Sequence, residues 1–253
     1  MKTHYRVGAW QRLCDFLTAP FHSPNTRLIK RLRRAGVEIG EGCVFRDPRS
    51  TTIDLTRPSL IRFGNHVDVN VRFTIMTHDF ASGVFLHHKK QLINSSGEVH
   101  LGNNIYCGRD VTILKGVHIG DNCVIGLGSV VMHDIPSNSV VAGCPARVIS
   151  SLEDYYQKRC QKAPEEAFEY ARSIVSQFGR RPIVEDFWEE FPLFVSGNEV
   201  DQYPMLPIRR QLQEAYPDYV AHHKAPYKGF EDFLAHALED PSKANKKANV
   251  DAL

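Results

Sequence analysis

Residues 101–131 read LGNNIYCGRDVTILKGVHIGDNCVIGLGSVV and repeat with a period of six. The turn residues Asn, Asp and Gly recur between the apolar positions, and they tolerate the left-handed backbone conformation that sharp corners require. A second series, of apolar or small residues, follows the first five anchors by four positions, from Ile105 to Ser129. The pattern indicates short strands joined by tight corners. The six anchors are Leu101, Cys107, Ile113, Ile119, Ile125 and Val131.

A period of six matches neither an α-helix, with 3.6 residues per turn, nor a single strand, with a period of two. It is typical of a parallel β-helix, in which each turn buries its apolar residues by stacking on the next. The strands of an all-β sandwich return every 8 to 12 residues and would not keep this register. Weaker repeats at Ile39-Gly40, Phe63-Gly64 and Ile75 extend the pattern. We therefore expect a mainly β fold, with the β-helix at residues 37–150.

The register of the hexads predicts which residues are neighbours. If three hexads make one turn, residues eighteen apart stack, so Arg109 shares an edge with Leu127 and Lys115 shares an edge with His133. The repeat breaks at residues 79–98, where we expect a loop excursion. An insertion of that size in a regular solenoid is usually functional.

The segments on either side of the repeat read as helical extensions. Residues 1–36 carry apolar residues at helical spacing, followed by the basic stretch 27–34, which suits a solvated helix face or an anionic surface. Residues 151–242 predict a helical carboxyl-terminal extension, with a helix start at residues 163–166 and a stop at Gly179. We expect disorder in the tail, residues 243–253. The apolar residues of the first segment are Trp10, Leu13, Phe16 and Leu17.

Composition excludes several classes of protein. With 31 basic and 29 acidic side chains, the net charge of +2 gives no reason to expect a nucleic-acid partner. No apolar run approaches the 18 to 20 residues of a membrane span, and a signal-peptide pattern is missing, so we expect a cytoplasmic protein without stable membrane insertion. Three of the six cysteines, Cys43, Cys107 and Cys123, fall on inward positions and are expected to be buried free thiols.

The last forty residues of the repeat carry a family resemblance. Residues 119–149 contain IGDN, IGLGSVV, DIPSN, AGCPA and RVI, and they closely resemble the hexapeptide-repeat acetyltransferases. The branch of galactoside and maltose O-acetyltransferases and polysaccharide-modifying relatives is the most similar. The resemblance covers about residues 37–150. It implies a left-handed parallel β-helix, assembly as a homotrimer with active sites between subunits, and acetyl transfer from acetyl-CoA.

The resemblance also indicates a catalytic base. His78, in Thr77-His78-Asp79, lies where the family carries its catalytic histidine. A sugar hydroxyl is a poor nucleophile, and an imidazole with a pKa near 6.5 is suited to take its proton. Asp79 is a candidate to orient the ring, and Glu98 is a second candidate. Other residues of the excursion would lie near the acceptor: Phe85, His87, His88, Lys89 and Lys90.

Further positions match the family's coenzyme A contacts. We expect phosphate binding to depend on Arg147 and on a neighbouring subunit, because the family's usual Thr-Lys is Met132-His133 here and its later basic residue is Ser150. Tyr106 replaces a tryptophan that the sugar branch often carries, which leaves the acceptor open. The matching positions are Gly108, Arg109, Leu127, Met132, His133 and Arg147.

Two alternatives remain on this fold. His100 and His118 are eighteen apart and should stack on an outer edge, which suggests a zinc-dependent hydratase of the γ-carbonic-anhydrase type. A catalytic zinc site needs three protein ligands, however, and no third histidine shares that column. The other alternative is a non-catalytic trimeric scaffold. We expect an acetyl-CoA-dependent O-acetyltransferase for a saccharide or saccharide-like acceptor, without a covalent intermediate, because no serine or cysteine has an evident base.

Overall fold

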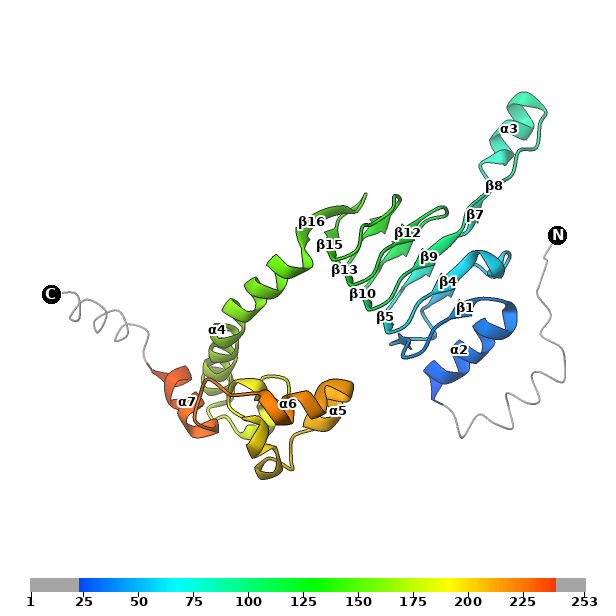
Figure 1. The fold of residues 1–253 in the computed structure, drawn as a ribbon. Coiled ribbons are helices and arrows are strands. Elements are labelled where there is room, and N and C mark those ends of the chain that lie inside the picture. Colours follow the sequence, from blue (N-terminus) through cyan, green and yellow to red (C-terminus); the bar gives the residue numbers. More distant parts are fainter. Residues whose placement is uncertain (1–22, 240–253) are drawn as a thin grey trace. The chain divides into compact units, whose positions relative to one another are not determined.

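The hexapeptide repeat folds into successive coils with three short strands each (Figure 1). The computed structural model describes residues 23–239. These residues form two compact units, of which the first ends at Tyr156 and the second begins at Gln157. The first face of the coil holds β1 (Glu38–Ile39), β4 (Ile61–Phe63), β9 (Val99–Leu101) and β12 (His118–Ile119). The second face holds β2 (Val44–Phe45), β5 (Val67–Val69), β10 (Ile105–Cys107), β13 (Cys123–Ile125) and β15 (Ser139–Ala142). The third face holds β3 (Thr52–Ile53), β6 (Thr74–Ile75), β11 (Thr112–Ile113) and β14 (Val130–Val131).

Strands stack in parallel, and the predicted eighteen-residue column is present on all three faces. The paired residues include His100 with His118, Ile105 with Cys123, and Ile113 with Val131. The first coil is longer, because Thr52 pairs with Thr74, 22 residues later. A 3-10 turn, η2 (Pro58–Leu60), lies within that longer coil.

The interior of the coil is apolar. All six anchors of the repeat are buried, with exposures of 2% or less. Cys43, Cys107 and Cys123 are buried and free, as predicted. Burial raises the pKa of the Cys107 thiol, so this side chain stays neutral and packs as a small apolar group.

The corners use the residues that the repeat supplies. Asn104 and Asn122 have positive φ of 54° and 57°. Their side chains form a ladder between coils, in which the Asn104 amide donates to Asn122 at 2.9 Å and the Asn122 amide donates to Asn138 at 3.0 Å. Gly108 allows close stacking, because a Cβ there would lie 2.7 Å from the Leu127 nitrogen. The corners thus fix the register of successive coils.

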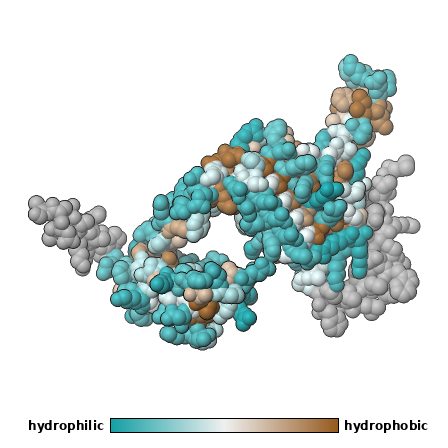
Figure 2. Space-filling model, viewed as in Figure 1, coloured by the Kyte–Doolittle hydropathy of each residue, from teal (hydrophilic) through white to brown (hydrophobic). Residues whose placement is uncertain are grey.

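The excursion leaves the coil between β6 and β9. It contains a two-stranded antiparallel ribbon, β7 (His78–Asp79) with β8 (Ser95–Ser96), and the helix α3 (Ser82–Lys89). The helix was not predicted, because the sequence between residues 79 and 98 has no amphipathic period. Figure 2 shows apolar side chains gathered on this excursion, among them the exposed Phe80, Val84 and Leu92.

Additional elements lie at both ends of the coil. Helix α2 (Pro24–Ala35) begins at the cap Ser23, ends at Gly36 with φ 105°, and buries Leu28 and Leu32. At the other end, β16 (Arg147–Ser151) pairs antiparallel with β15. The predicted helical residues from Trp10 to Leu17 lie outside the described residues, as does the tail after residue 242.

The second unit is helical and has its own core. Helix α4 (Leu152–Phe178) begins in the last residues of the first unit, continues through Pro164 and ends before Gly179, whose φ is 61°. The predicted start at residues 163–166 is therefore wrong, because Ser151 already caps the helix by accepting from the Asp154 N–H at 3.0 Å. The remaining elements are η3 (Val184–Phe187), η4 (Phe191–Leu193), η5 (Gly197–Gln202), α5 (Ile208–Leu212), η6 (Gln213–Ala215), α6 (Tyr216–His222) and α7 (Phe230–Leu238).

Aromatic residues dominate the core of this second unit. Phe187, Phe194 and Phe233 are fully buried, and their rings meet at centroid distances of 5.1 and 5.4 Å. Within residues 23–239, no helix has both the length and the apolar character needed to cross a lipid bilayer.

Candidate functional site

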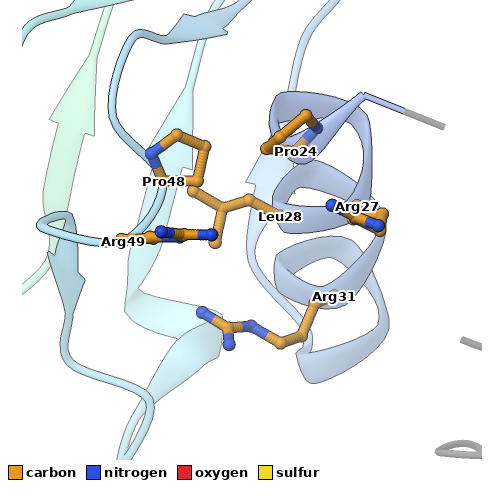
Figure 3. A pocket seen from close by; sticks show the side chains of 6 residues that line it. All are labelled: Pro24, Arg27, Leu28, Arg31, Pro48 and Arg49. Carbon is orange, nitrogen blue, oxygen red and sulfur yellow. The ribbon is translucent and has the colours of Figure 1, made fainter. Parts of the chain in front are cut away.

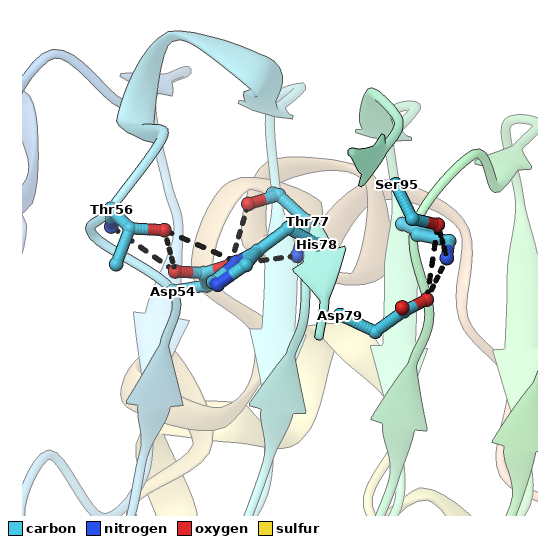
Figure 4. A network of polar contacts seen from close by, with 7 residues as sticks. Asp54, Thr56, Thr77, His78, Asp79 and Ser95 are labelled. Carbon is cyan, nitrogen blue, oxygen red and sulfur yellow. Dashed lines mark hydrogen bonds and ion pairs between the residues drawn. The ribbon is translucent and has the colours of Figure 1, made fainter. Parts of the chain in front are cut away.

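His78 lies at the corner where the coil leaves its regular path. Its Nδ1 lies 2.5 Å from Oδ2 of Asp54, which follows β3 in the coil below (Figure 4). The pairing of Ile53 with Ile75 brings the ends of β3 and β6 together, and with them these two side chains. Asp54 was not predicted from the sequence. Its only signal in the sequence is an aspartate directly after the β-branched pair Thr52-Ile53.

The Asp54 carboxylate is buried and has several hydrogen-bond donors. Its side chain is 4% exposed. Oδ2 accepts from the Thr77 N–H at 3.0 Å and the Thr77 hydroxyl at 2.6 Å, and Oδ1 accepts from the Thr56 hydroxyl at 2.7 Å. Burial alone would raise the pKa of Asp54, but the hydrogen bonds from Thr77, Thr56 and His78 outweigh it and hold the pKa well below its usual value. The carboxylate is therefore ionised at neutral pH.

The ionised carboxylate sets the orientation of the His78 ring. Because Asp54 can only accept, the hydrogen of a neutral imidazole resides on Nδ1 and Nε2 carries a lone pair. The side chain of His78 is 28% exposed, so the ring is held from one side and remains accessible. A fixed, accessible imidazole with its second nitrogen on a buried carboxylate is suited to accept a proton from a hydroxyl.

The two acidic residues proposed to orient His78 have other partners. Asp79 accepts from the Lys115 ammonium and from the Ser95 hydroxyl, on the side of the ribbon away from Asp54 (Figure 4). Glu98 forms an ion pair with Arg62 at 3.2 Å on the first face. Asp79 was a candidate to orient the ring and does not do so, because His78 and Asp79 are successive residues of β7 and their side chains point to opposite sides of the strand.

The residues that match coenzyme A contacts border the last strand of the third face. Arg109 and Leu127 share one corner, where the Gly128 N–H donates to the Arg109 carbonyl at 2.8 Å. Met132 and His133 follow the other end of β14 and are exposed. Arg147 follows Ala146, whose N–H donates to the Val130 carbonyl of β14 at 2.9 Å.

Met132 lies in the same column of stacked corner residues as Met76, which precedes His78 by two positions. Met76 donates its N–H to Ile113, and Leu114 donates to Val131, so the positions 76, 114 and 132 stack in successive coils. Two coil spacings of about 4.8 Å place Met132 about 10 Å along the stack from the turn that carries His78. Met132, at the end of this column, is 46% exposed, whereas Leu127, which is 77% exposed, lies at the corner before β14.

Two other predicted groups lie elsewhere. Tyr106 is on β10, on the second face, where its hydroxyl accepts from the Asn70 amide at 3.2 Å. The excursion residues Phe85, His87, His88 and Lys89 are on α3, which lies in the chain between β7 and β8, the two strands of the ribbon that carries His78. Lys90 ends that helix with φ 58°.

His100 and His118 stack as the column arithmetic predicts. Their rings meet edge to face with centroids 6.0 Å apart. A shallow pocket beside them is also lined by Asp134 and Ser137. In the part of the chain that the structure describes, no three His, Cys, Asp or Glu side chains are arranged to hold a metal ion.

Comparison with known proteins identifies the family to which the chain belongs. No protein family model matches the chain. Protein CapG of Staphylococcus aureus is 38% identical over 134 residues, which cover 53% of this chain and 76% of CapG. The galactoside O-acetyltransferase of Escherichia coli (strain K12) is 45% identical over 82 residues. The chain belongs to the hexapeptide-repeat acetyltransferases.

The matched regions differ in extent among these acetyltransferases. The chain spans 39% of the length of the galactoside O-acetyltransferase, and the match covers 29% of this chain. Among solved structures, a maltose O-acetyltransferase from Clostridium difficile 630 is 26% identical, covers 55% of this chain and 84% of that chain, and has a TM-score of 0.37. As in other hexapeptide-repeat acetyltransferases, the coil is a left-handed parallel β-helix, as predicted.

Proposed function

We propose that this protein transfers an acetyl group from acetyl-CoA to a hydroxyl of a saccharide or saccharide-like acceptor, with His78 as the general base. The observation that carries the proposal is the contact of 2.5 Å between His78 Nδ1 and the buried Asp54 carboxylate. Membership of the hexapeptide-repeat acetyltransferases and the similarity to a galactoside O-acetyltransferase support the reaction and the acceptor class.

The proposed reaction is a direct transfer. Nε2 of His78 takes the proton of the acceptor hydroxyl while its oxygen attacks the thioester carbon. The imidazolium that forms lies beside the Asp54 carboxylate, which stabilises its positive charge. When the carbon–sulfur bond breaks, the same nitrogen returns the proton to the departing thiolate. Asp54 stays ionised throughout, so it is a positioning residue for His78.

The edge beside β14 fits the donor chemically. Leu127 and Met132, one at each end of β14, offer exposed apolar surface for the pantetheine arm. Arg147 is exposed and supplies a guanidinium, which suits a phosphate group. We propose these residues, with Gly108, Arg109 and His133, as the binding edge for acetyl-CoA.

The test is turnover and donor binding in His78→Ala. Release of the coenzyme A thiol is followed with a panel of mono- and oligosaccharides, and acetyl-CoA affinity is measured by calorimetry. We expect turnover to fall about a hundredfold or more, the usual contribution of a general base, with donor affinity unchanged within twofold. His222→Ala, an exposed histidine of α6, is the matched control.

Other outcomes distinguish the alternatives. Full turnover in His78→Ala would reject the base. Stoichiometric zinc with carbon dioxide hydration and no coenzyme A binding would favour the hydratase, and the absence of both activities would favour a scaffold. We further propose a homotrimer that acts in the cytoplasm in polysaccharide biosynthesis. Analytical ultracentrifugation tests the assembly.

A further inference from the structure

A second pocket lies between α2 and the corner that joins β2 to β3 (Figure 3). Its volume is about 290 Å³. The helix contributes two arginines and the corner contributes a third, while two prolines and Leu28 form the apolar part of the wall (Figure 3). The lining residues are Pro24, Arg27, Leu28, Arg31, Pro48 and Arg49.

The charge in this pocket is one-sided. Among residues 23–239, none that lines the pocket is acidic. Within residues 23–239, the ion pairs include Arg33 with Glu41 and Arg46 with Asp68, but none involves Arg31 or Arg49. The Asp47 carboxylate on the corner accepts from the backbone N–H of Arg49 at 3.1 Å.

The pocket is separate from the site of acyl transfer. Arg49 precedes β3 and Asp54 follows it, so the two lie beyond opposite ends of the same strand. The pocket therefore has no role in the proton transfer assigned to His78.

We propose that Arg27, Arg31 and Arg49 form a binding site for a phosphate group. Guanidinium groups bind phosphate oxygens through paired N–H donors, and an anion between them relieves their mutual repulsion. The apolar wall formed by Leu28 and the prolines suits the carbon skeleton that carries the phosphate. Such a phosphate belongs either to a small soluble phosphate ester or to a lipid headgroup.

The experiment measures binding of inorganic phosphate and of vesicles to the full chain. In calorimetry, wild type binds phosphate saturably, and Arg31→Gln combined with Arg49→Gln weakens binding about tenfold or more. Arg31→Lys keeps the charge but loses the planar fork, so an intermediate loss is expected. Arg210→Gln, an exposed arginine of α5, removes one charge elsewhere and leaves binding unchanged. Circular dichroism confirms that each variant is folded.

Vesicles distinguish the two sources of phosphate. A lipid headgroup is identified if three results are found together. The wild-type protein sediments with phosphatidic acid vesicles, added inorganic phosphate releases it from them, and the double variant does not bind them. Binding of free phosphate without vesicle binding identifies a soluble ligand. The proposal is overturned if wild type binds neither probe up to about 10 mM phosphate, a very weak affinity. Equal binding by the double variant would overturn it too.

Discussion

The Asp54 carboxylate contacts Nδ1 of His78 at 2.5 Å, although 24 positions separate the two residues in the chain. The contact exists because β3 and β6 stack in register and end at the same corner. A buried acceptor therefore fixes the ring on which the proposed transfer depends.

Replacing Asp54 with Asn should lower turnover at least tenfold. The neutral amide no longer stabilises an imidazolium, and its NH2 group favours the tautomer with the hydrogen on Nε2. Acetyl-CoA affinity should be unchanged, and the acidic limb of the pH–rate profile should move because the negative charge next to His78 is gone. An unaltered pH profile together with unaltered turnover would reject the positioning role.

The same carboxylate makes stability depend on pH. The folded-state pKa of Asp54 is lowered, so its contribution is fully present above the unfolded value near 3.9 and is lost as the pH falls through that value toward the folded pKa. We expect Asp54→Asn to lower the Tm by about 3–8 °C at pH 7. The gap from wild type should narrow below pH 4 in thermal melts followed by circular dichroism. A gap that is constant from pH 7 to pH 3 would contradict this.

Lys115 attaches the excursion to the coil. Its ammonium contacts Asp79 and Ser95, one on each strand of the ribbon that carries His78. Lys115→Met should loosen the ribbon, lower turnover about two- to fivefold and speed proteolysis near α3, because a partly exposed ion pair contributes about 1 kcal/mol or less.

The matched control for this variant is Arg72→Met. It removes an ion pair with Asp110 at another corner, away from the ribbon. Proteolysis rates near α3 that are equal in both variants would show that Lys115 does not hold the excursion. The readout is limited proteolysis with mass spectrometry, alongside steady-state kinetics.

Gly108 is predicted to tolerate no side chain. A Cβ there would lie 2.7 Å from the Leu127 nitrogen, which is backbone and cannot move without shifting the coil. Gly108→Ala should destabilise the fold by about 1–3 kcal/mol and weaken acetyl-CoA binding at the adjoining edge. Gly83→Ala on α3 is the control, since its Cβ would meet only the Phe80 ring at 3.3 Å. Chemical denaturation and calorimetry measure both effects.

Arg147→Gln tests the proposed phosphate contact of the donor. A lost charge-assisted hydrogen bond should weaken binding of coenzyme A about tenfold. Binding of dephospho-coenzyme A, which lacks one phosphate, should be affected less if Arg147 contacts the 3′-phosphate. Equal affinities for wild type and variant toward both compounds would remove Arg147 from the binding edge.

The sequence predicted the coil well because each hexad specifies its own geometry. Every anchor from Leu101 to Val131 is buried, and the eighteen-residue columns pair as expected. The six-residue repeat did not predict neighbouring residues where the coils are longer than eighteen residues. Asp54 went unnoticed because its coil is 22 residues long rather than eighteen, which hid its place opposite His78.

The second unit was harder to predict for a different reason. Pro164 suggested a helix start, yet α4 already begins at Leu152 and accepts the proline in its interior. Pro164 removes the N–H that would reach the Cys160 carbonyl, and Cys160 is exposed, so water can solvate that oxygen. Whether the Cys160 carbonyl is exposed to water depends on the tertiary structure, so the sequence pattern around Pro164 could not predict it.

The caps at the two ends of the coil bear on how the protein avoids aggregation. A stack of identical parallel rungs is a template that would add further rungs from a neighbouring molecule and grow into a fibre. Helix α2 covers the first rungs with Leu28 and Leu32, and the antiparallel β16 occupies the edge of β15. These two elements oppose the addition of further parallel strands at the first rungs and at the edge of β15.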